Sequence, residues 1–218
     1  MSVWLSGIER RVLWSRRRRA LIVLLAVFLA LLFLDKWIYE KIYINNPDTD
    51  FMRTLRVAGS LWPWLFIGAA LIAQATAVRP RVRGLAGAGA MIFLSAALSG
   101  LIAEVVQFLA GRLRPGAVKP AGSHQFRPFL ERFHDTTDLA FPSSHAAVAF
   151  GAAFLVWFVY PRAGAVALVA AAGCGLSRVL VGAHFASDVF AAAVLGYATA
   201  RLLRPGGWRG LAPRPLLP

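Results

Sequence analysis

The sequence predicts an all-α, polytopic membrane protein: a bundle of six transmembrane helices with both termini in the cytoplasm. Three observations predict this class. The 218-residue chain has a mean hydropathy of +0.61, and only 16% of its residues are charged, against about 25% in soluble domains. A soluble protein this apolar could not cover its own surface, whereas lipid can surround a membrane protein. The basic residues also gather on alternate connections between the apolar runs.

Six apolar runs approach the length of about 20 residues with which a helix crosses a bilayer. They cover residues 20–38, 57–78, 84–110, 144–160, 163–181 and 185–203. The first, "ALIVLLAVFLALLFLDKW", is the clearest. We interpret it as a retained span, because no small-x-small cleavage site follows it. The last three are rich in Ala, Gly and Ser, which let helices approach closely. Together the runs define a transmembrane domain over 20–203.

The flanks of this domain are basic. In residues 1–19, Trp4, Ile8 and Val12 share one face of a helix, which predicts an amphipathic segment on the cytoplasmic membrane surface. A disordered basic tail fits the same residues equally well. Residues 204–218 are expected to form a short cytoplasmic tail. Cys174 is the only cysteine, which excludes an intrachain disulfide and a cysteine-based zinc site.

The distribution of charge predicts which connections share a side of the membrane. Fourteen of the 24 Lys and Arg residues lie before the first run, between the second and third runs, between the fourth and fifth runs, or at the end of the sixth run and beyond it. Glu9 is the only acidic residue on that side. They are Arg10, Arg11, Arg16, Arg17, Arg18, Arg19, Arg79, Arg81, Arg83, Arg162, Arg201, Arg204, Arg209 and Arg214. The positive-inside rule places this side in the cytoplasm, and this accounts for the net charge of +14 without a nucleic-acid partner. Loops 39–56, 111–143 and 178–187 then share the opposite face.

Three polar clusters fall on that opposite face. They are "QFLAGRLRP" at 107–115, "FPSSH" at 141–145 and "SRVLVGAHFASD" at 177–188. Arg114 and Arg178 carry planar donor forks that suit phosphate oxygens. The Pro142-Ser143-Ser144 sequence marks a helix start, where free N–H groups and the helix dipole favour an anion.

Histidines and a carboxylate complete the set. His184 and Asp188 are four residues apart, so on a helix the carboxylate could hold one imidazole nitrogen and leave the other free to attack. His145 could protonate a leaving oxygen. These groups suit phosphoryl transfer through a phosphohistidine, with arginines in place of a metal ion.

The three clusters resemble the motifs of the type 2 phosphatidic acid phosphatase family, K-x6-R-P, P-S-G-H and S-R-x5-H-x3-D. Ser177, Arg178, His184 and Asp188 match the third motif in full. Pro142, Ser143 and His145 match the second, with Ser144 at the glycine position. Arg114 and Pro115 match the first, but Gln107 stands where the family has lysine.

The resemblance implies a role for each matched residue. His184 is expected to be the nucleophile, Asp188 its orienting partner and His145 the general acid. Arg114, Arg178, Ser143, Ser144 and Gln107 are expected to bind the substrate phosphate. Gln107 carries no charge, so Arg112 is a candidate for the missing cation. Ser177 either supports the site or caps and packs its helix.

Other interpretations of these residues remain open at this stage. His184 and Asp188 could be a buried pair that ties two helices together. A metal site of His145, His184 and Asp188 is disfavoured because the nearby arginines would repel a cation. We therefore expect no metal and no cofactor.

The expected function is hydrolysis of a lipid phosphomonoester or diphosphate, on a substrate whose chains stay in the bilayer. The resemblance implies undecaprenyl diphosphate, phosphatidic acid, phosphatidylglycerol phosphate or lipid A 1-phosphate, with isoprenoid diphosphate slightly favoured. The expected location is the bacterial inner membrane, with the site facing the periplasm. A lipid phosphotransferase using the same site and a catalytically decayed membrane protein are the alternatives, and the oligomeric state is left open.

Overall fold

Seven helices make up the regular structure of the described residues. The computed structural model describes the chain except residues 1, 46–49, 78–82, 129–130, 132–136 and 205–218. The helices are α1 (Ser2–Ile42), α2 (Asp50–Val57), α3 (Leu61–Ala77), α4 (Arg83–Ala110), α5 (Ser144–Val159), α6 (Pro161–Leu180) and α7 (Ala186–Leu203). Within these residues there is no strand, only two isolated bridges that pair Arg112 with Phe126 and Leu113 with Leu139. The prediction of an all-α architecture is confirmed.

Each of the six predicted apolar runs falls mainly in helix, but six membrane spans are not established. By length and composition, four helices can cross a membrane: residues 18–42 of α1, residues 86–110 of α4, α6 and α7. The predicted run 57–78 starts at the last residue of α2 and otherwise falls mainly in α3; these two helices meet at 50° and together could form a fifth span. Helix α5 has only 16 residues, about 24 Å at 1.5 Å per residue, against a hydrocarbon core of about 30 Å.

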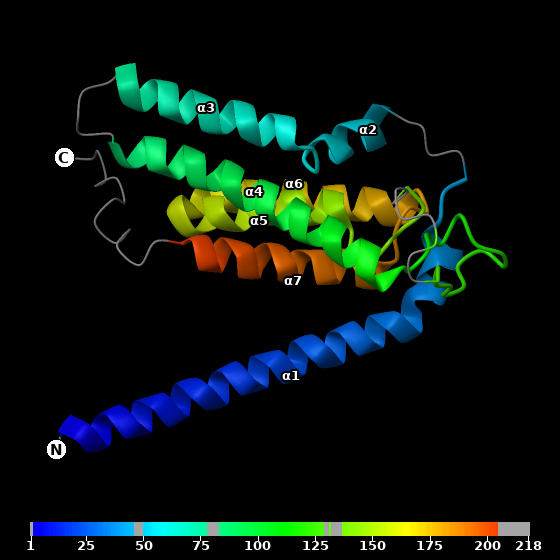
Figure 1. Ribbon diagram of the computed structural model, residues 1–218, viewed down its shortest axis with the longest axis horizontal. Helices are drawn as coiled ribbons and strands as arrows, with labels where there is room; N and C mark the ends of the chain where they lie inside the picture. Colours follow the sequence, from blue (N-terminus) through cyan, green and yellow to red (C-terminus); the bar gives the residue numbers. More distant parts are fainter. Residues whose placement is uncertain (1, 46–49, 78–82, 129–130, 132–136, 205–218) are drawn as a thin grey trace.

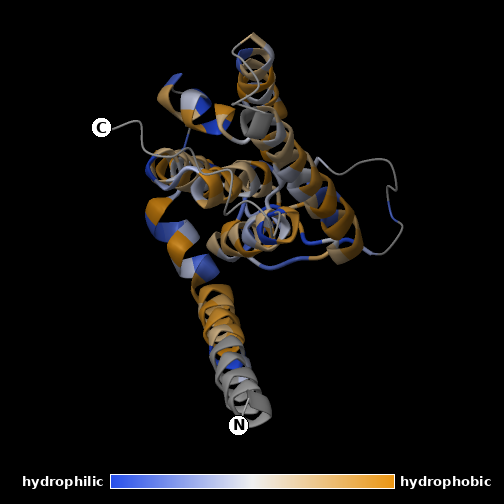
Figure 2. Ribbon diagram, turned by 90° about the vertical axis from the view of Figure 1, so that its left-hand side faces the viewer, coloured by the Kyte–Doolittle hydropathy of each residue, from blue (hydrophilic) through white to orange (hydrophobic). Residues whose placement is uncertain are grey.

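The N-terminal segment does not end at residue 19 in the structure. Helix α1 runs without a break from Ser2 to Ile42, so the basic segment and the first apolar run are one helix. Most of α1 stands apart from the other helices, and its apolar stretch forms the orange band in Figure 2. The predicted C-terminal tail, 204–218, lies outside the described residues apart from Arg204.

Helix α5 lies at the centre of the bundle and packs against α4, α6 and α7, while α3 covers α4. Its inward positions are mostly small, and six of its nine buried residues are Ala or Gly. Small side chains allow backbones to approach closely, which is how helices associate where water provides no driving force. Gly151 illustrates this, because its carbonyl accepts a hydrogen bond from the Ser95 hydroxyl of α4 at 2.7 Å.

The packing of α5 fixes where the polar motifs meet. Helices α4 and α6 end, and α5 and α7 begin, at the same end of the bundle, next to the 111–143 loop (Figure 1). The start of α1 and the end of α7 lie at the other end. The three polar clusters therefore converge, as their assignment to one face requires.

Candidate active site

The N-terminus of α5 forms one wall of the site. Ser143 is its N-cap, and its hydroxyl accepts the Ala146 N–H at 3.4 Å. The first backbone N–H groups of a helix have no acceptor within the helix, so they favour an anion. The Gln107 amide donates to the Pro142 carbonyl at 2.6 Å and is buried. Gln107 therefore holds the turn that starts α5, and this differs from the phosphate contact expected of it.

Two arginines form the cationic part of the site. Arg178, near the end of α6, is buried, and its Nε has no hydrogen-bond partner among the described residues. Arg114 follows α4 and donates from Nε to the Leu139 carbonyl at 3.2 Å. This bond fixes the direction of the Arg114 side chain. It uses Nε and not the two terminal NH₂ groups. A buried, unpaired guanidinium is costly, so an anionic ligand is the natural partner of this pair.

His184 is fully buried in the turn between α6 and α7, which is made by Gly182 at φ 66°. Its Nδ1 lies 2.8 Å from the carbonyl oxygen of Ala140. A carbonyl can only accept, so Nδ1 carries the proton and Nε2 carries the free lone pair. Burial, and then the charges of Arg178 and Arg114, lower the pKa of His184 well below its ordinary value. The hydrogen bond and the lowered pKa both favour a neutral imidazole whose Nε2 lone pair is available.

Asp188 does not hydrogen-bond to His184 as the sequence led us to expect. Its Oδ2 lies 3.9 Å from His184 Nδ1 and accepts the backbone N–H of Phe185 at 2.7 Å. The expectation assumed one helix, but α7 begins at Ala186, so His184 is outside it. The Ala140 carbonyl takes the orienting contact, and Asp188 holds the backbone beside the histidine.

His145 is the second residue of α5 and lies close to the turn between α2 and α3. A Cβ built on Gly59 would fall 2.7 Å from the Cβ of His145, so only glycine fits there without a shift. His145 interacts electrostatically with Arg178, Arg56 and Arg114, and it also influences His184. Both imidazoles and both motif arginines therefore lie near one another at the end of the bundle where α5 and α7 begin.

Arg112 does not supply a cation to this site. Its Nη1 donates to Asp188 at 2.7 Å and its Nη2 donates to Asp35 at 2.8 Å, and the side chain is buried. These two carboxylates occupy both terminal nitrogens, so the suggestion that Arg112 replaces the family lysine does not fit. Ser177 donates to the Cys174 carbonyl at 2.7 Å within α6, which is the packing alternative for this residue.

Two charged residues near the site were missed in the sequence. Asp35 lies within the first apolar run, where an ionisable group usually has a function, and that was a usable signal. Arg56 lies at the end of α2 and interacts electrostatically with His145 and Arg178. Nothing in the local sequence distinguishes Arg56 from other basic residues of its loop.

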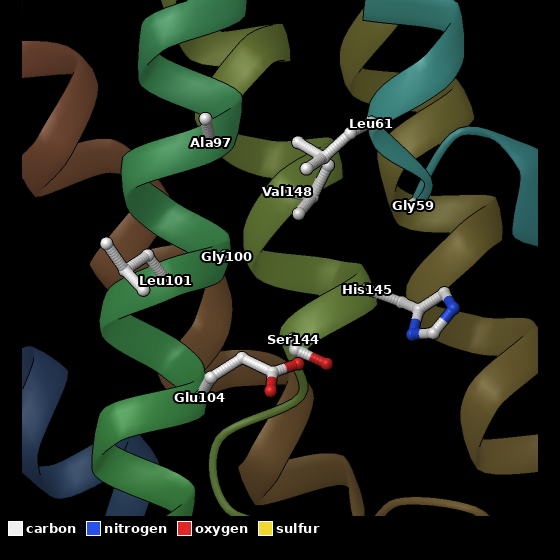
Figure 3. Close-up of a pocket in the computed structure, with 9 residues that line it drawn as sticks. All are labelled: Gly59, Leu61, Ala97, Gly100, Leu101, Glu104, Ser144, His145 and Val148. Atoms are coloured by element: carbon white, nitrogen blue, oxygen red, sulfur yellow. The ribbon is translucent and has the colours of Figure 1, made fainter.

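A cavity of about 430 Å³ opens beside the site between α3, α4 and α5. Figure 3 shows the residues that line it: Gly59, Leu61, Ala97, Gly100, Leu101, Glu104, Ser144, His145 and Val148. Most of them are apolar. Glu104, Ser144 and His145 form its polar end, where the Glu104 side chain extends from α4 towards the start of α5. His145 therefore lies in the wall of a cavity that is otherwise mostly apolar.

Comparisons with known proteins agree with the motifs. The family described as the PAP2 superfamily matches residues 88–209. A lipid A 1-phosphatase of Rhizobium etli is 36% identical over 135 residues, which are 55% of this chain and 56% of that protein. A lipid A 1-phosphatase of Rhizobium johnstonii is 37% identical over 110 residues, 50% of this chain and 43% of that protein. The bacitracin transport permease protein BcrC of Bacillus licheniformis is 29% identical over 110 residues, 50% of this chain and 53% of that protein.

The chain spans about half the length of these curated relatives. A structural likeness covers more of it. The crystal structure of a transmembrane PAP2 type phosphatidylglycerolphosphate phosphatase from Bacillus subtilis superposes with a TM-score of 0.59, over 88% of this chain and 97% of that one. The two sequences are 21% identical, so this likeness concerns the fold.

Proposed function

The chain belongs to the PAP2 superfamily, and on that premise we propose that it is a membrane lipid phosphatase that works through a phosphohistidine. The observation that carries the proposal is the convergence of His184, His145, Arg114 and Arg178 at the N-terminus of α5. The four side chains come from three separate motifs. Together they provide a nucleophile, a proton donor and an anion site.

In the first step, Nε2 of His184 attacks phosphorus and the bond from phosphorus to the lipid oxygen breaks. His145 gives its proton to that oxygen, while Nδ1 of His184 keeps its proton on the Ala140 carbonyl. A bound phosphate dianion favours the protonated form of His145. In the second step, water gives a proton to His145 and its oxygen attacks phosphorus. The N–P bond then breaks, releasing inorganic phosphate and restoring neutral His184.

Charge neutralisation falls to fixed groups of the protein. Arg114, Arg178 and the first N–H groups of α5 surround the position of the transferred phosphoryl group. Donors that are held in place before the reaction stabilise the equatorial oxygens of the transition state without reorganising. This supports a reaction that needs neither a metal ion nor a cofactor.

Arg56 supplies the cation that Gln107 lacks. Arg56 is exposed at the end of α2, and Gly59 of the following turn lies against His145 and donates its N–H to the Arg56 carbonyl at 2.9 Å. Its charge acts on both His145 and Arg178. Gln107, in turn, is committed to Pro142. The third positive charge thus comes from a different helix than in the family motif.

We expect Arg56→Gln to raise the KM for a lipid phosphate about tenfold, the loss of one charge-assisted hydrogen bond. Gln107→Lys in the wild-type background should change KM by less than about threefold, because a cation is already present. In the Arg56→Gln background, Gln107→Lys should bring KM most of the way back to the wild-type value. A double-mutant cycle measures this coupling between the two positions. Steady-state kinetics on the four proteins check this.

Arg53→Gln is the matched control, since Arg53 lies one turn earlier on α2 and pairs with Asp50 at 3.5 Å. It should leave KM unchanged. Equal increases in KM for the Arg53 and Arg56 substitutions would contradict a specific role of Arg56, because any positive charge on α2 would then have the same effect. Additive effects of the Arg56 and Gln107 substitutions would mean that the two positions do not share a role.

The substrate is proposed to be a lipid whose chains remain in the bilayer while its phosphate enters from the side. The apolar cavity between α3, α4 and α5, which ends at His145, supports this route. Lipid A 1-phosphate is the first substrate to test, because two relatives at 36% and 37% identity carry that activity in their names. The site is proposed to face the periplasm from a bacterial inner membrane.

A phosphate-release assay tests the proposal directly. The purified protein in detergent is given lipid A 1-phosphate, phosphatidic acid, phosphatidylglycerol phosphate and undecaprenyl diphosphate, each with EDTA present. We expect release from at least one lipid, unchanged by EDTA and inhibited by vanadate, which mimics the transferred group. The absence of release from all four would contradict a hydrolase, and loss in EDTA would contradict a metal-independent site.

A further inference from the structure

Asp35 is a buried carboxylate on a helix whose other apolar-run residues mostly face outward. Its exposure is 1%, while Leu29, Phe33, Leu34 and Trp37 around it are exposed. A buried carboxylate is costly unless it is paired and hydrogen-bonded. Such a group on the first span, far in sequence from all three motifs, calls for a partner of opposite charge.

The partner of Asp35 is Arg112. Oδ2 of Asp35 accepts from Nη2 of Arg112 at 2.8 Å and also from the Ser187 hydroxyl. Oδ1 accepts the backbone N–H of Ser187 at 3.0 Å. Both oxygens are therefore used, and both accept a hydrogen bond from Ser187 in the first turn of α7.

The contacts continue from Arg112 to the turn that carries His184. Nη1 of Arg112 donates to Asp188 at 2.7 Å and to the Ser187 hydroxyl at 2.8 Å. The guanidinium also lies over the Phe185 ring, 4.2 Å from its centroid. Asp188 in turn accepts the N–H of Phe185, the residue next to His184.

His124 closes the outer edge of this cluster. Its Nε2 lies 3.0 Å from Nη2 of Arg112, and since an arginine only donates, Nε2 must accept. Burial, and then the charge of Arg112, lower the pKa of His124 from its ordinary value, which agrees with an unprotonated Nε2. One guanidinium is thus enclosed by two carboxylates, one hydroxyl and one neutral imidazole.

We propose that Asp35 is a positioning residue, which orients His184 through Arg112 and Asp188 and makes α1 a part of the catalytic apparatus. Asp35 fixes Arg112, Arg112 fixes Asp188, and Asp188 fixes the backbone beside His184. The Nε2 lone pair must point along the line of attack on phosphorus, and a shift of about 1 Å costs roughly 100-fold in rate. This inference rests on the proposed function, because it concerns the orientation of the same nucleophile.

The test compares Asp35→Asn with Glu40→Gln in the full-length protein. Both substitutions remove one acid from α1, but Glu40 is exposed, and its ion-pair partner among the described residues is Lys36 at 3.9 Å. For Asp35→Asn we expect kcat to fall roughly 10- to 100-fold with KM within about twofold. The inhibition constant of vanadate should rise in proportion, because vanadate needs the in-line histidine. Glu40→Gln should change none of the three.

The vanadate measurement separates positioning from damage to the fold. A smaller fraction of folded protein lowers kcat but alters neither KM nor an inhibition constant. If Asp35→Asn cannot be purified, Ser187→Ala removes one hydroxyl from the same cluster without changing its charge, and should show the same pattern more weakly. Asp35→Asn should also add little loss in an Arg112→Gln background, since Asp35 acts through Arg112.

An active Asp35→Asn enzyme with wild-type kcat and vanadate inhibition would overturn the inference and leave the proposed function standing. Fully additive losses with Arg112→Gln would overturn it too. Wild-type protein that releases no phosphate in the same assay would overturn both.

Discussion

Replacing His184 with asparagine is expected to abolish phosphate release from every lipid that the wild-type protein hydrolyses, by at least about 1,000-fold. The asparagine amide can still donate to the Ala140 carbonyl, as Nδ1 of His184 does. It has no counterpart of Nε2, so it cannot form the N–P bond. The substitution thus removes the nucleophile and keeps the contact that orients it.

Two measurements distinguish loss of the nucleophile from loss of the fold. Thermal unfolding in detergent should show a folded variant, since the Ala140 contact and the capping of Phe185 by Asp188 are retained. Phosphate release in a steady-state assay should fall to the background of the reaction without protein. An asparagine variant that keeps more than a few per cent of wild-type kcat would mean that another group attacks phosphorus.

Replacing His145 with alanine is expected to cost about 100- to 10,000-fold in kcat on a lipid phosphate, the usual contribution of a general acid or base. The first step should depend on the leaving group, because a lipid alkoxide needs a proton and p-nitrophenolate does not. With p-nitrophenyl phosphate, His145→Ala should therefore release about one nitrophenol per active site rapidly. Slow turnover should follow, because the same residue activates water in the second step.

Stopped-flow absorbance measures this burst, and His145→Gln is the companion variant that fills more of the space beside Gly59. Both variants should give the burst. A first turnover that is as slow as the later ones would contradict the assignment of proton donation to His145. A steady rate equal to that of the wild type would contradict its part in the second step.

The helices could be predicted from the sequence because apolar length needs no knowledge of packing. Their interruptions could not. The run 57–78 is broken at residues 58–60, where Gly59 lies close to His145, a residue far away in the chain. Helix α5 is one residue shorter than the expected span 144–160. Its central position among α4, α6 and α7, and not its composition, explains how the bundle accommodates so short a helix.

The candidate site could likewise be predicted from the sequence only in part. His145, His184, Arg114 and Arg178 could be assigned because their residue types and spacing form motifs. The partner of His184 could not, because a backbone carbonyl such as that of Ala140 has no sequence signature. Likewise, Asp35 and Arg112 are 77 positions apart in the sequence, and only the folded chain brings their charges together.

The most direct test of the account is to locate the phosphoryl group on the protein during turnover. Wild-type protein is mixed with a ³²P-labelled substrate, quenched within milliseconds in alkali, which preserves phosphohistidine, and digested with trypsin. Cleavage after arginine separates His184, in peptide 179–201, from His145, in peptide 133–162. We expect acid-labile label in 179–201. Label in 133–162, or full turnover with no label on the protein, would contradict attack by His184.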